Sequence, residues 1–145
     1  MNTPLVSKSN FEKFYKNIII SKKHRIEILR LSNSFIIDIV LLPIHFGLKF
    51  ISLEKLILDQ ITEKNFDSIF DELKFLSYLH SLVLNFKEYI QNLNDIFSKI
   101  MSLSKLKYCK TKYRIKTDQN QLSSDCNKYS YSSVEHLIID GRLHI

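Results

Sequence analysis

Apolar residues recur along this chain with a spacing that fits neither a plain helix nor a plain strand. In LEKLILDQI, Leu53, Leu56 and Leu58 are spaced three and then two, whereas a helix continues at three or four and a strand at two. The L-x-x-L-x-L spacing occurs five times, with first positions at 26, 53, 79, 103 and 134. The steps are 27, 26, 24 and 31 residues, and three of them fall in the ~20–29 period of leucine-rich repeats. The alternative is one α/β domain whose strands are unrelated.

The five copies predict five short strands, near residues 26–31, 54–59, 80–85, 104–109 and 135–140. Segments between the copies carry apolar residues at helical spacing, as in the stripe Phe66, Ile69, Phe70 and Leu73. Strands that alternate with helices favour a parallel sheet. The sequence therefore predicts an α/β leucine-rich-repeat-like solenoid, with parallel strands on its concave face and helices on its convex face.

Length and composition fit one repeat domain over residues 1–145. The polar segment 117–133 has no apolar periodicity and occupies the longest step, which predicts an inserted surface loop. The most apolar run, Phe35 to Leu42, contains Asp38 and falls short of the ~20 residues that span a bilayer. We therefore expect no membrane partner and a cytoplasmic or nuclear location.

Catalytic chemistry has little support in the sequence. The two cysteines are 17 residues apart, and no histidine is paired at helical spacing with another histidine or a cysteine. The only glycines are Gly47 and Gly141, so the chain contains no glycine-rich phosphate loop. We predict a protein that is not an enzyme, without catalytic residues, metal ligands or cofactors.

Four stretches resemble a known family. FISLEKLILDQI, FLSYLHSLVLNF, IMSLSKLKYCK and YSSVEHLIIDGR are similar to the repeat region of a large, divergent family of F-box proteins with leucine-rich-repeat-like domains. The resemblance implies the substrate-recognition repeats of a cullin–RING ubiquitin ligase subunit, or a truncated relative. An F-box would precede the repeats, so a ligase adaptor is an expected partner only if an F-box lies upstream.

Alternation along each predicted strand assigns side chains to the face that points away from the core. Mixed aliphatic and charged residues on that face suit binding of an unidentified protein partner, whereas a solvated sheet with β-branched residues is the plainer interpretation. The predicted partner-binding residues are Arg30, Lys55, Ile57, Asp59, Val83, Asn85, Lys105, Lys107, His136 and Ile138.

A basic segment offers a second functional hypothesis. KLKYCKTKYRIK, residues 105–116, holds six basic residues and no acidic one in a chain of net charge +6. In a strand, Lys110, Lys112, Arg114 and Lys116 would share one face, and Tyr108 and Tyr113 could stack on bases, which would suit nucleic-acid binding. An acidic protein partner and a solvated edge that resists aggregation are the other interpretations.

Overall fold

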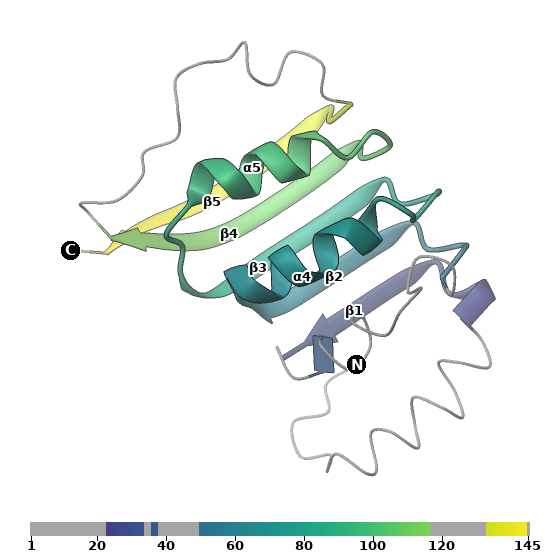
Figure 1. Ribbon diagram of the computed structural model, residues 1–145, viewed down its shortest axis with the longest axis horizontal. Helices are drawn as coiled ribbons and strands as arrows, with labels where there is room; N and C mark the ends of the chain where they lie inside the picture. The colour runs from purple at the N-terminus through teal and green to yellow at the C-terminus, as the bar shows by residue number, and fades with distance from the viewer. Residues whose placement is uncertain (1–22, 34–35, 38–49, 117–132, 145) are drawn as a thin grey trace.

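Five parallel strands form one sheet, side by side in the order of the chain (Figure 1). The computed structural model describes residues 23–33, 36–37, 50–116 and 133–144. The strands are β1 (Ile28–Ser32), β2 (Lys55–Ile61), β3 (Ser81–Tyr89), β4 (Tyr108–Lys116) and β5 (His136–His144). Each neighbouring pair is parallel, which confirms the predicted parallel α/β sheet.

Within the described residues, two helices connect successive strands and lie on the same face of the sheet (Figure 1). Helix α4 (Glu63–Leu73) follows β2, and helix α5 (Leu93–Met101) follows β3; a short 3-10 turn, η2 (Lys23–Arg25), precedes β1. Thr62 and Asn65 form a capping box at the start of α4, with both bonds to backbone amides at 3.1 Å. These caps satisfy amides that the first helical turn leaves free.

The core lies between the sheet and the two helices. Inward side chains of neighbouring strands stand in rows, such as Leu29, Leu56 and Leu82, and each of these leucines is buried. Phe66 of α4 and Phe97 of α5 are fully buried against them. The apolar stripes that predict the helices are therefore the faces that cover the sheet.

One backbone contact recurs at the start of every strand pair. The carbonyl oxygens of Glu27, Glu54, His80 and Lys107 each accept hydrogen bonds from two consecutive amides of the following copy, at 2.8–3.1 Å. These four carbonyls occupy equivalent positions just before successive strands. Each copy is thus seated on the preceding one in the same way.

The predicted register of the fourth strand is wrong. The prediction placed it at 104–109, but β4 is Tyr108–Lys116, and Cys109 rather than Leu106 stands beside Leu82. Leu106 is buried three residues before Cys109, at the position equivalent to Leu53 and Leu79.

The error arose because leucine at residues 103 and 106 matched the pattern better than the smaller residues that fill the strand. Cys109 and Thr111 are fully buried there, and their side chains contact each other at 3.6 Å, which gives the threonine hydroxyl a polar neighbour. With this correction the first positions are 26, 53, 79, 106 and 134, and the steps become 27, 26, 27 and 28 residues.

The other strands agree more closely with the predictions. β1, β2, β3 and β5 each begin one or two residues later than expected. The row of inward leucines ends at β5, where Leu137 is 37% exposed. An apolar stretch at 35–51 and the loop predicted at 117–133 fall mostly outside the described residues.

Tyr113 and Gly141 meet where β4 pairs with β5. Tyr113 is buried and packs edge-on against Phe97 of α5, with ring centroids 6.2 Å apart. A Cβ atom on Gly141 would lie 2.7 Å from the Tyr113 hydroxyl oxygen, closer than such contacts allow. The glycine therefore leaves the space that the tyrosine ring occupies.

Truncation of Leu82 and of Leu137 to alanine should lower the free energy of unfolding by different amounts, because Leu82 lies in the covered part of the sheet and Leu137 at its edge. Leu82→Ala should lower the free energy of unfolding by about 2–5 kcal/mol, because it opens a cavity in a closed core. Leu137→Ala occupies the same row but starts partly exposed, so its loss should be clearly smaller. Urea denaturation of both variants measures the difference; equal losses would contradict this account of the core.

Candidate binding surface on the sheet

The face of the sheet opposite α4 and α5, here called the open face, presents three rows of side chains across the strands. On this side of the sheet, the described residues include no further strand and no α-helix as long as α4 or α5 (Figure 1). By the register of the pairs, the rows are Ile28, Lys55, Ser81, Tyr108 and His136; then Arg30, Ile57, Val83, Lys110 and Ile138; then Ser32, Asp59, Asn85, Lys112 and Asp140.

The corrected register of β4 changes which predicted residues belong to this surface. Lys105 and Lys107 were predicted there, but both precede β4, and Lys107 pairs with Glu135 at 3.1 Å. Tyr108 and Lys110 take their places in the rows. The remaining eight predicted residues stand in the rows as expected. Sequence reasoning assigned Tyr108, Lys110 and Lys112 to the separate basic segment, because it read their strand three residues out of register.

The basic segment thus joins the open face. Lys110, Lys112 and Arg114 are exposed on one side of β4, as the alternation predicts, and the side chain of Lys116 lies outside the described part. The prediction that Tyr113 stacks on bases is wrong, because its ring is buried on the opposite side, among the core residues. Burial raises the pKa of Tyr113.

A carboxylate at the carboxyl end of the sheet organises its neighbours. Asp59 accepts a hydrogen bond from Arg30 Nε at 2.7 Å, one from Ser32 Oγ at 3.3 Å and one from the Asn85 amide. Burial alone would raise the pKa of Asp59, but the hydrogen bonds from Asn85 and Arg30 and the Arg30 charge outweigh it. The pKa therefore lies below its ordinary value of 3.8, and the residue stays ionised at neutral pH.

A pocket of about 380 Å³ opens beside this carboxylate, at the ends of β2, β3 and β4. Two irregularities in the ladders lie next to it: a register shift at Gln60, whose φ is 58°, and another between Asn85 and Tyr89. Bulges of this kind bend a strand and re-aim its side chains. Arg114 lines the pocket, donates to the Lys87 carbonyl at 3.1 Å and lies 5.6 Å from the Tyr89 ring centroid.

Charge at this pocket is mainly positive. Lys87, Lys112 and Arg114 line it, and the negative charge of Asp59 is already matched by Arg30. Within the described residues, Lys110 and Lys112 form no ion pair. The open face therefore offers unmatched cations beside the aliphatic pair Ile57 and Val83.

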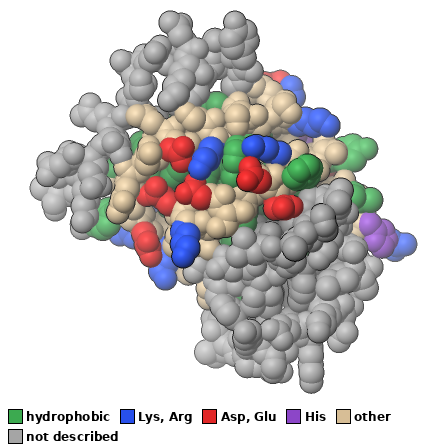
Figure 2. All heavy atoms as spheres, in the orientation of Figure 1, with side chains coloured by type: hydrophobic (Ala, Val, Ile, Leu, Met, Phe, Trp, Pro, Cys, Tyr) green, Lys and Arg blue, Asp and Glu red, His purple; other side chains and the backbone are tan. Residues whose placement is uncertain are grey.

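The opposite side of the molecule has a different character. Figure 2 shows acidic and basic side chains gathered together over the helices. Lys99 pairs with Asp67 at 2.5 Å and with Asp95 at 3.0 Å, and the hydrogen bond that it donates to Asp67 is the largest of the effects that raise the Lys99 pKa. The charge of Lys99 is thus matched by carboxylates of both helices.

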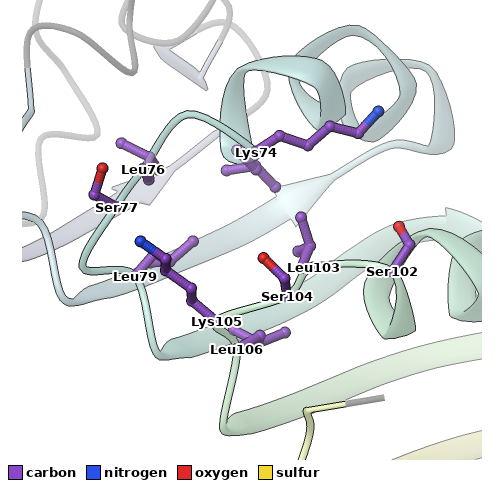
Figure 3. Close-up of a pocket in the computed structure, with 10 residues that line it drawn as sticks. Lys74, Leu76, Ser77, Leu79, Ser102, Leu103, Ser104, Lys105 and Leu106 are labelled. Carbon is purple, nitrogen blue, oxygen red and sulfur yellow. The ribbon is translucent and has the colours of Figure 1, made fainter. Parts of the chain in front are cut away.

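A second pocket, of about 270 Å³, lies at the amino end of the sheet (Figure 3). The connections from α4 to β3 and from α5 to β4 form its walls, with leucines such as Leu79 and Leu106 and the polar rim residues Lys74, Ser104 and Lys105. These leucines belong to successive copies, so the pocket is a gap between stacked turns. Lys105, predicted on the binding face, lines this pocket instead.

Reactive chemistry is not evident among the described residues. Cys109 is fully buried, and desolvation raises its thiol pKa to about 11, so the nucleophilic thiolate is scarce at neutral pH. No group of three His, Cys, Asp or Glu side chains in the described ranges could hold a metal ion. In the same ranges no helix has the length and apolar character needed to cross a membrane.

Comparisons with models of protein families, with curated proteins and with solved structures found no match to this chain.

Replacement of Asp59 by asparagine should flatten the acid part of the stability profile. Asp59 binds its proton more weakly in the folded chain than in the unfolded one, so its stabilisation is complete above the ordinary pKa of 3.8 and is lost as pH falls through the lowered folded pKa. The free energy of unfolding of Asp59→Asn, measured by urea titration from about pH 5 to pH 3, should fall less than that of the natural chain.

Asp71→Asn is the matched control, since Asp71 is an exposed carboxylate on α4, paired with Lys74 at 3.2 Å. A profile for Asp59→Asn that coincides with that of Asp71→Asn would show that the Arg30–Asp59–Asn85 contacts do not depress the pKa.

Proposed function

We propose that this chain is a leucine-rich-repeat-like solenoid that binds a protein partner on its open face and catalyses no reaction. One observation carries the proposal. All-parallel sheets in α/β proteins are normally covered on both faces, whereas α4 and α5 cover only one face of this sheet. A sheet with one face left for ligands is typical of solenoids, which bind through an extended surface formed by successive repeats.

The regularity of the stacking supports the solenoid part of the proposal. The equivalent carbonyls from Glu27 to Lys107 each receive two amides from the next copy, and the corrected steps vary only between 26 and 28 residues. In repeat proteins each unit contacts its neighbours alone, and such an arrangement repeats one interface along the chain. Unrelated strands of a single α/β domain would not be expected to repeat these contacts.

The chemistry of the open face indicates the character of the partner. Ile57 and Val83 are half-buried and adjacent in one row, which makes them the natural centre of an interface. Lys110 and Lys112 flank them on β4, and Arg30 flanks them on β1. A desolvated apolar centre with a charged rim is the usual organisation of protein interfaces. The partner surface should therefore be apolar at its centre and acidic on the side that faces β4.

Nucleic acid is the second candidate, because three cations of β4 stand exposed on one face at alternate positions. Burial of Tyr113 removes one of the two tyrosines on which this hypothesis partly rested, whereas Tyr108 stands half-buried in the rows of the open face. The three cations form an electrostatic surface, and single-stranded nucleic acid would bind to it through its phosphates.

The resemblance to F-box proteins extends the first proposal. In that case the open face would hold a protein destined for ubiquitination, and a ligase adaptor would join only through an upstream F-box. Co-precipitation of the adaptor with the product of the full transcript tests this extension separately from partner binding.

Affinity capture from cell extract separates the two candidates. Binding of a protein partner should persist after nuclease treatment of the extract. Ile57→Asp places a charge at the centre of the open face, so it should abolish this capture. Lys112→Glu should weaken the same capture without abolishing it, because it reverses one rim charge. Lys64→Glu, an exposed reversal on α4, is the matched control and should capture the partner normally.

The contrary result is also defined. Capture that disappears with nuclease, survives Ile57→Asp and is lost with Lys112→Glu would favour nucleic acid. Its affinity for a single-stranded oligonucleotide should then fall with the logarithm of salt concentration, with a slope of about 0.7 per neutralised phosphate.

A further inference from the structure

The last strand exposes apolar side chains on both faces of the sheet. Leu137, Ile138 and Ile139 are 37%, 45% and 41% exposed, and they are consecutive residues of β5. Among the described strands, β5 pairs only with β4 and forms one edge of the sheet. An exposed, apolar edge strand is a template for pairing with a strand of another chain.

The backbone geometry identifies the groups that this edge offers. The N–H of His136 donates to Lys107 of the neighbouring copy at 3.0 Å, so His136 and Ile138 direct their backbone groups toward β4. Successive residues of a strand direct these groups to opposite sides. The N–H and C=O of Leu137 and Ile139 therefore point outward from the edge.

The side chains around Ile138 are complementary to the same side chains on a second copy of β5. If a second β5 ran antiparallel with the two Ile138 residues opposite each other, Leu137 would face Ile139 of the second copy, and His136 would face Asp140 of the second copy. Apolar residues would meet apolar residues, and a basic side chain would meet an acidic one. A register centred on Ile139 instead would place Ile138 opposite Asp140, an unfavourable pairing.

We propose that two copies of this chain associate through β5, antiparallel, about a two-fold axis at Ile138. Leu137 and Ile139 form the hydrogen-bonded pairs on their outward groups, and Ile138 forms the closer, non-hydrogen-bonded pair. Such an interface is isologous, as in most homodimers. Residues opposite each other lie on the same face, so the two open faces join into one surface. This association is independent of the partner proposed above.

Disulfide trapping tests both the association and its register. Ile138→Cys, in a Cys126→Ser background, should cross-link on mild oxidation, because residues directly opposite in antiparallel strands lie within the Cα separation that a disulfide spans. Asp140→Cys in the same background is the matched control. In the proposed dimer the two cysteines at position 140 would be offset by four residues along the strands, so this variant should not cross-link.

Sedimentation velocity of the full natural chain provides the second readout. The expected mass is twice the 17.2 kDa of the monomer, and Ile138→Lys should restore the monomer by placing two like charges at the axis. Circular dichroism of Ile138→Lys should match the natural chain, which distinguishes lost association from lost folding. A monomeric natural chain, a dimer that survives Ile138→Lys, or equal cross-linking of both cysteine variants would overturn the proposal.

Discussion

The sheet depends on backbone hydrogen bonds between neighbouring parallel strands, which no strand can form within itself. A parallel strand has no hairpin partner, so its amides must be satisfied by a copy that lies a full repeat away in sequence. Here the carbonyls of Glu27, Glu54, His80 and Lys107 meet that need at the same point of each copy. Because this contact fixes the register, it also decides which side chains face the helices and which face outward.

The fold was largely predictable, since the leucine spacing and the apolar stripes around Phe66 and Phe97 encode strands and helices directly. The fourth strand was not. Its core positions are held by Cys109 and Thr111, small side chains whose burial no hydrophobic pattern reveals, while Leu103 and Leu106 imitate the pattern three residues earlier. A uniform repeat length of 26 to 28 residues would have placed this strand correctly. The Asp59 network was hidden for another reason, since its members are 26 and 29 residues from Asp59.

This register error separated two hypotheses that the structure brings together. When Lys110 and Lys112 were counted as part of a basic segment, they indicated a site of their own. On the correct strand they adjoin Val83 and Asn85, so charge and apolar surface belong to one face. The electrostatics of the two sides then differ: Lys99 is paired with two carboxylates over the helices, whereas Lys110 and Lys112 of β4 have no ion-pair partner among the described residues.

The meeting of Tyr113 with Gly141 has a consequence for how this protein can change over evolutionary time. Repeat arrays grow and shrink by duplication or loss of whole units, which requires that one unit be able to replace another. In the solenoid proposed above, the ring of Tyr113 fills the place of a side chain on the next strand, so the strand after β4 needs glycine at that position. The counterpart of Gly141 on β3 is Phe86, so a unit copied from there would bring a phenyl ring into that space. We therefore expect the residues at positions 113 and 141 to change together, and an engineer who wishes to lengthen such a solenoid should insert new units before β4.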